Sequence, residues 1–171
     1  SGTIKDGAGN NATLTLATPG QANSLSANKA LTVDTTVPVV SSVNSTVSND
    51  YYDIGDVIPI TIIFSEAVNV VTTGGTPTLT IETGTNDAVV NYSSGTGTNT
   101  LTFNYTVVEG HINSDLSYTS TSALALNSGT IKDLALNDAI LTLPAENSSN
   151  SLADNRNLNV DGVIPTITSV S

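Results

Sequence analysis

The chain contains no cysteine, methionine or tryptophan among its 171 residues. Without thiols it can form neither a disulfide framework nor a thiolate metal site, so a folded unit has to rely on its hydrophobic core or on bound ions. Basic residues are also scarce: four Lys and Arg stand against fifteen Asp and Glu, and the formal net charge is -11. Such a surface repels nucleic acid and attracts cations. We therefore expect no nucleic-acid partner.

Long apolar runs and enzymatic motifs are missing as well. No apolar run reaches the roughly 20 residues that a membrane span needs, so we expect no membrane span in this chain. His111 is the only histidine and lies in a polar loop without a nucleophile motif nearby. This indicates a surface histidine and no enzyme. Asp53 and Asp56 could in principle act as the acid and base of a glycosidase, but acidic loop residues are expected in any acidic protein.

The N-terminal segment of the chain returns near its C-terminus. Aligned without gaps, Ser1–Asn44 and Ser128–Ser171 are identical at about half of their positions, and Val33-Asp34 returns as Val160-Asp161. The period of roughly 127 residues is that of a domain and is too long for a solenoid unit. We expect residues 1–36 to be the C-terminal part of a preceding repeat, residues 37–163 one complete repeat and residues 164–171 the start of the next. The parent protein is then longer than this chain.

Alternation of apolar and polar residues predicts strands. Every second residue of Thr100–Val107 is apolar, which is typical of a strand with one buried face. Val57–Phe64 is apolar on both faces, as in a central strand, although Pro59 would need a gap or bulge in the ladder. Thr121–Leu126 could form one helical turn. Further strands are expected at Val37–Val43, Thr78–Glu82, Ala88–Tyr92, Leu116–Thr119, Ala139–Leu143 and Leu158–Val160. Many short strands with turn signals between them predict an all-β fold, an antiparallel β-sandwich.

Several phrases of the sequence resemble a known family. They are IGDVIPITIIFSEAV at Ile54–Val68, TNTLTFNYTV at Thr98–Val107, SALALNSGTIKD at Ser122–Asp133 and the two Val-Asp-x-x-x-Pro junctions. These phrases resemble the Ig-like or cadherin-like tandem repeats of giant bacterial surface adhesins, such as RTX-adhesin stalks. The resemblance implies an extracellular, cell-surface location, a long stalk that projects a binding tip, and calcium that stiffens the domain junctions. The GGxGxDxUx nonapeptides of RTX proteins are absent, so calcium would have to lie at junctions or in loops.

Carboxylates near the expected junctions are candidate Ca²⁺ ligands, because Ca²⁺ takes about six to eight oxygen ligands. Asp34 and Asp161 each end a strand shortly before a proline, Pro38 or Pro165, that limits the backbone conformations of the junction. The full candidate set is Asp34, Asp53, Asp56, Glu66, Asp133, Asp138 and Asp161. The alternative is that these residues are ordinary, solvated turn formers.

Three functions fit the sequence. The first is a structural or adhesive stalk repeat whose partners are adjacent repeats of the same protein. The second is a subunit of a filament or surface layer joined to neighbouring chains by strand complementation, with Ser1–Thr36 as the donor. The third is a module that binds glycans or surfaces, for which Tyr51-Tyr52 is the sole adjacent aromatic pair.

Overall fold

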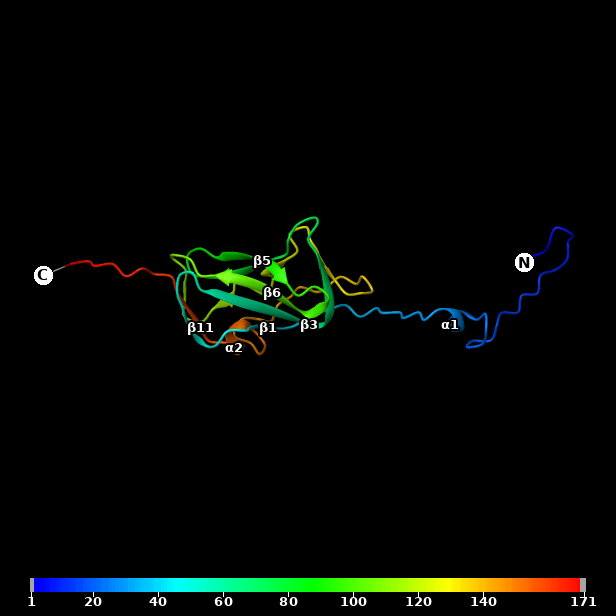
Figure 1. Ribbon diagram of the computed structural model, residues 1–171, viewed down its shortest axis with the longest axis horizontal. Coiled ribbons are helices and arrows are strands. Elements are labelled where there is room, and N and C mark those ends of the chain that lie inside the picture. Colours follow the sequence, from blue (N-terminus) through cyan, green and yellow to red (C-terminus); the bar gives the residue numbers. More distant parts are fainter. Residues whose placement is uncertain (1, 170–171) are drawn as a thin grey trace. The chain divides into compact units, whose positions relative to one another are not determined.

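The computed structural model describes residues 2–169 (Figure 1). The chain divides into two compact units, Ser1–Asp34 and Thr35–Ser171. Strands hold 38% of the residues and helices 5%, so the fold is all-β, as predicted. Antiparallel sheets curl into a half-barrel. Neither of the two helical turns, nor any other part of residues 2–169, forms a helix long and apolar enough to cross a membrane.

Residues 35–169, the described part of the larger unit, contain eleven strands and one helical turn. They are β1 (Val40–Ser45), β2 (Asp50–Tyr52), β3 (Val57–Val71), β4 (Thr78–Glu82), β5 (Ala88–Ser94), β6 (Thr98–Thr106), β7 (Ile112–Asn113), β8 (Ser117–Tyr118), β9 (Leu124–Ala125), β10 (Thr130–Lys132), α2 (Leu152–Asn155) and β11 (Leu158–Asp161). The larger sheet has the order β1-β3-β6-β5-β4-β8, with β10 also paired to β3 and β9 to β4. The smaller sheet has the order β2-β11-β7. Its β11–β2 pair is parallel, which the sequence did not predict.

The core is built on β3 and β6, which pair along most of their length. The predicted inward faces are confirmed, because their apolar side chains are almost completely buried: Ile58, Ile60, Ile62 and Phe64 on β3, and Leu101, Phe103, Tyr105 and the following Val107 on or after β6. Pro59 pairs with Asn104 of β6. Its missing N–H falls beyond the end of β1, whose last pair with β3 is Ser45 with Ile60. The gap that Pro59 was expected to make in the ladder therefore coincides with the place where β1 ends.

Two local predictions are wrong. Thr121–Leu126 does not form a helical turn, because Leu124 and Ala125 pair with β4 as strand β9 and Leu124 is buried. Ala139–Leu143 is not a continuous strand and makes one isolated bridge, between Val39 and Ile140. In both places the partner strand, and not the local pattern, determines the backbone conformation.

The smaller unit holds the helical turn α1 (Leu25–Asn28) and a tight loop at residues 6–10. Both have counterparts in the larger unit. The Ser24 Oγ accepts a hydrogen bond from Ala27 N at 3.3 Å, and the Ser151 Oγ accepts one from Asp154 N at 3.3 Å, so each turn has the same N-cap. The sequence repeat is thus also a repeat of local structure.

Candidate metal site

The loop after β10 places a buried carboxylate. Asp133 is 2% exposed, and its two oxygens accept hydrogen bonds from Asn137, from the backbone N at 2.8 Å and from Nδ2 at 2.7 Å. Leu136 N closes the loop by donating to the Asp133 carbonyl at 3.3 Å. Since both carboxylate oxygens are held by one asparagine, the orientation of the Asp133 side chain is fixed.

The residues that lead into β1 are attached to this loop. Asn137 Nδ2 donates to the Thr36 carbonyl at 3.1 Å, and Ile140 N donates to the Pro38 carbonyl at 2.8 Å. Val39 is bound to Ser65, next to Glu66 on β3: Val39 N donates to the Ser65 Oγ at 3.1 Å and Ser65 N to the Val39 carbonyl at 2.8 Å. The backbone just after Asp34 is therefore tied to the loop that carries Asp133 and to the strand that carries Glu66.

Asp34, Glu66 and Asp133 each offer one carboxylate oxygen, and these oxygens lie within 4.8 Å of one another. Asp34 is exposed, Glu66 is half-buried and Asp133 is buried. Three converging carboxylate oxygens on a protein of net charge -11 form a suitable partial ligand set for a hard cation such as Ca²⁺. This group could hold a metal ion.

The protonation state of Asp133 suits this chemistry. Burial raises the pKa of the Asp133 carboxyl, but hydrogen bonds from the side chain and backbone of Asn137 and from the backbone of Ala135 and Leu136 outweigh burial, so the net pKa lies below its usual value. Asp133 is therefore ionised at neutral pH, which a metal ligand requires.

The structure does not bring the other four candidate ligands into this group. Asp53 and Asp56 form a turn before β3, in which the Asp56 Oδ2 accepts from Asp53 N at 2.9 Å. Asp138 is paired with Lys132 Nζ at 2.6 Å. The Asp161 Oδ1 accepts from Val163 N at 3.1 Å. In these contacts the four residues act as turn formers or surface ion-pair partners.

His111 is part of a local packing contact. Its Nδ1 lies 2.8 Å from the hydroxyl of Tyr105, and the two rings stack with centroids 5.7 Å apart. Burial lowers the pKa of His111 and raises the pKa of Tyr105 to about 12, so at neutral pH the phenol is protonated and can donate to a neutral imidazole. The sequence predicted a surface histidine but could not show that Tyr105 would lie against it.

The aromatic residues, all of which lie in the described part of the chain, point mostly inward. Tyr105, Tyr118, Phe64 and Phe103 are buried, and Tyr52 and Tyr92 are half-buried. Tyr51 is the exposed exception, at 77%. A single exposed ring offers only a small surface on which a sugar could stack.

No family model, no curated protein and no solved structure matches the chain. Its function has therefore to be inferred from its internal repeat and from the geometry of these residues.

Proposed function

We propose that this chain is a structural repeat of a tandemly repeated, extracellular bacterial surface protein, in which an Ig-like β-sandwich serves as a stalk or spacer module. The observation that carries the proposal is the repeat itself. Residues 2–34 and 129–161 share both sequence and local hydrogen bonding across a domain-sized period. A domain-sized unit repeated along one chain supplies length.

The distribution of side chains supports a structural role. Large aliphatic and aromatic residues fill one core, and the acidic side chains lie mainly in turns. The aromatic side chains serve packing, which disfavours the glycan-binding alternative. The high net negative charge keeps neighbouring molecules soluble outside the cell and draws in cations.

The proposed calcium site consists of Asp34, Glu66 and Asp133. Asp34 precedes β1, Glu66 lies on β3 and Asp133 follows β10. A cation bound by all three would restrain the backbone that leads into β1. Backbone carbonyls and water would have to complete a shell of about six to eight oxygens.

The experiment is thermal unfolding of the full chain in calcium and in chelator at equal ionic strength. Binding stabilises the folded state in proportion to the logarithm of ligand concentration, so saturating Ca²⁺ at about 100 times Kd should add about 2.7 kcal/mol and raise the melting temperature. Glu66→Gln should remove most of this increment. Glu109→Gln, a substitution of the same chemistry at an exposed position, should leave it intact.

The stalk role is tested by small-angle scattering on a tandem fusion of two copies of residues 37–163, in which Asp161 of the first copy stands at the sequence position of Asp34 before the second copy. Calcium should give an extended particle with a narrow distribution of sizes, and chelator a more flexible one. Equal melting temperatures and equal scattering in both buffers would exclude the calcium site and remove its support for the stalk function.

A further inference from the structure

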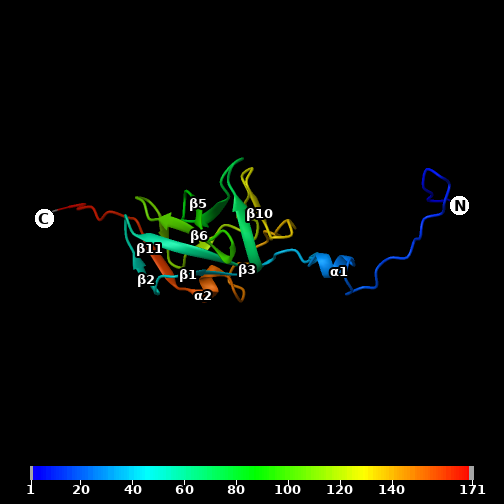
Figure 2. The same cartoon turned by 45° about the vertical axis from the view of Figure 1, so that its right-hand side comes forward.

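The chain enters and leaves the larger unit at opposite ends of the first half of β3. At the entry, Val40 at the start of β1 pairs with Phe64. At the exit, Val160 of β11 pairs with Tyr52, the last residue of β2, and β3 is the next strand along the chain (Figure 2). From Val57, where β3 begins, to Phe64 the strand rises about 23 Å. A pull on the chain on both sides of the unit therefore acts along β3.

This direction loads the first and last strands of the unit in shear. β1 runs antiparallel to β3 and starts at the entry. The hydrogen bonds of an antiparallel ladder are perpendicular to the strands, so a pull along β1 strains all of them at once and does not break them one by one. β11 ends at the exit and pairs with β2 and β7, so its bonds are loaded in the same way.

The segment that leads into β11 is bonded directly to β1. Val43 N donates to the Asn150 carbonyl at 2.9 Å, and Asn155 Nδ2 donates to the Val43 carbonyl at 2.8 Å. Arg156 Nε donates to the Ser45 carbonyl at 3.0 Å. We call Asn150, Asn155 and Arg156 the β1 clamp. A pull on β1 passes through the clamp to the segment before β11 and has no need to cross the rest of the core.

The strand side of the clamp is shielded from water. Val43 is fully buried and Ser45 is 3% exposed. Leu152 of α2 is also fully buried, and α2 packs against β1. A hydrogen bond in such surroundings is electrostatically stronger than one in water, and breaking it leaves a buried polar group without a partner. The clamp bonds are therefore costly to break.

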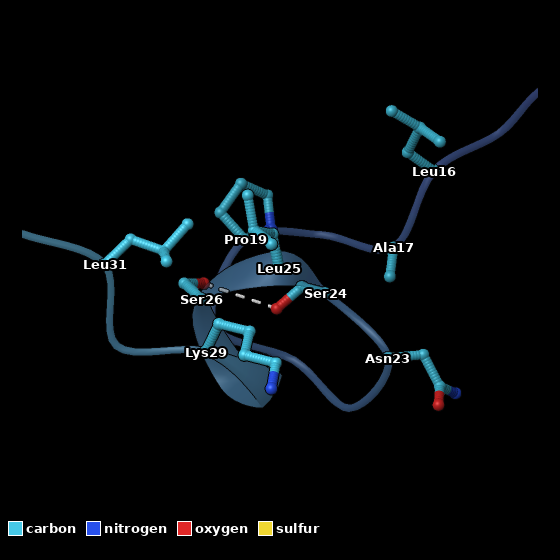
Figure 3. Close-up of a pocket in the computed structure, with 9 residues that line it drawn as sticks. All are labelled: Leu16, Ala17, Pro19, Asn23, Ser24, Leu25, Ser26, Lys29 and Leu31. Atoms are coloured by element: carbon cyan, nitrogen blue, oxygen red, sulfur yellow. Dashed lines mark hydrogen bonds between the residues drawn. The ribbon is translucent and has the colours of Figure 1, made fainter.

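Local bonds give the turn that carries the clamp its shape. The Ser151 Oγ caps α2 by accepting from Asp154 N. In the smaller unit the Ser24 Oγ caps α1 in the same way and also lies 3.3 Å from the Ser26 Oγ (Figure 3). Because the turn forms in two different surroundings, α2 does not depend on β1 for its conformation, and it holds the clamp side chains in place.

The backbone at the exit is fixed as well. Gly162 N donates to the His111 carbonyl at 2.7 Å, and the Gly162 carbonyl accepts from Gly110 N at 2.9 Å. A Cβ at Gly162 would overlap the Val108 carbonyl oxygen, so this residue fits closely against the loop after β6. β6 in turn pairs with β3. The exit is thus attached to the same central pair of strands as the entry.

We propose that the larger unit resists unfolding under tension, because β1 and β11 are loaded in shear and the β1 clamp has to break before β1 can leave the core. Forced unfolding is governed by the unfolding rate and not by the equilibrium stability, so the contacts that break first decide the outcome. The inference rests on the proposed stalk function for the source of the tension. The resistance itself is a property of this fold and can be measured on the chain alone.

Dependence on the pulling direction is the first test, with cysteine pairs as attachment points because the chain has no cysteine of its own. In T35C/V163C, single-molecule force spectroscopy in chelator pulls the unit along the chain. In T35C/T72C, it pulls the start of β1 away from the end of β3, so that the ladder opens from one end. T35C/V163C should unfold at the higher force at equal pulling speed. Equal forces, or a higher force for T35C/T72C, would overturn the proposal.

The second test separates the clamp from general stability. N155A removes the bond to the Val43 carbonyl, whereas V90A trims a buried side chain of β5, which is neither β1 nor part of residues 150–161. Urea unfolding should show lower equilibrium stability for both variants. At a fixed force along the chain, N155A should unfold about fivefold faster than wild type, the factor for one ordinary hydrogen bond. V90A should unfold at nearly the wild-type rate, because β5 stays in place when β1 detaches.

If N155A unfolds no faster under force than V90A does, the clamp carries no tension and the proposal is wrong. Should N155A fail to fold, R156Q removes only the contact with Ser45 and gives the same comparison. All pulling is done in chelator, so the result is independent of the calcium site. Equal forces in both directions beside successful calcium and scattering experiments would remove the clamp and leave the stalk function. The opposite pattern would remove the stalk function and leave the clamp.

Discussion

At the scale of single residues, His111 and Tyr105 link stability to pH. Because burial lowers the pKa of His111, the unfolded chain binds a proton more readily than the folded one. Stability should therefore be fully present above the ordinary histidine pKa of about 6.5 and decline as the pH falls through the window below it. Protonation also removes the acceptor that the Tyr105 hydroxyl uses at 2.8 Å.

We expect the free energy of unfolding to fall between pH 7 and pH 5.5 by at most about 1.4 kcal/mol per pH unit, the limit for one proton. His111→Gln should give a nearly flat profile over this range, because the chain has no other histidine. Urea unfolding at a series of pH values measures both profiles. An equal slope in the two proteins would show that another group is responsible.

At the scale of elements, close approach of the backbone fixes the turn between β5 and β6. Gly95 has φ of 111°, and a Cβ at this position would lie 2.0 Å from the Thr100 carbonyl oxygen. Gly110 also has a positive φ, 87°, but a Cβ there would meet no atom within 4 Å. The two glycines thus separate the cost of backbone conformation from the cost of steric overlap.

Gly110→Ala should destabilise the protein by about 1–2 kcal/mol, the penalty for an L-residue in the left-handed region. Gly95→Ala should cost about 1–3 kcal/mol more, because the turn has to move to relieve the clash. Chemical denaturation of both variants measures the difference. Equal costs would mean that the β5–β6 turn relaxes freely.

Strands with strong alternation could be predicted from the sequence, and those that depend on a partner could not. The two central strands and the β4 segment, Thr78–Glu82, carry their own apolar pattern and were located, although β3 continues to Val71, beyond the predicted end at Phe64. The short strands β2, β7 and β10 have two or three residues each, too few to show a period, and form only because a longer strand or β11 lies beside them. The helical turns were missed because a single capped turn has no helical periodicity.

The sequence predicted that carboxylates would form the candidate site, but it did not predict which of them would lie close together. Proximity to junctions and turns selected seven carboxylates, of which the structure brings Asp34, Glu66 and Asp133 together. Which of them converge depends on the attachment of residues 36–39 to the loop of Asp133, through contacts about 100 residues apart in sequence, such as Asn137 with Thr36. The sequence also did not show that the Asp138 carboxylate would pair with Lys132.

At the scale of the whole molecule, the net charge of -11 opposes compaction. Only four basic side chains offset fifteen acidic ones, so most carboxylates repel their neighbours over distances of about a Debye length, 10 Å at 0.1 M salt. Monovalent salt screens this repulsion without occupying a specific site. Salt should therefore raise the stability of the folded state in a general way, in addition to any stabilisation by calcium bound at a specific site.

We expect the melting temperature in chelator to rise by several degrees between about 10 mM and 500 mM NaCl, where 1 kcal/mol corresponds to about 2–8 °C. The double variant D87K/E109K changes two exposed acids to bases, each change adding two charges, so the net charge becomes -7 and the salt response should shrink. The calcium increment at fixed ionic strength should remain in this variant, because neither residue belongs to the carboxylate group of Asp34, Glu66 and Asp133. If the calcium increment shrinks in step with the salt response, calcium acts through bulk screening, and the three carboxylates do not form a binding site.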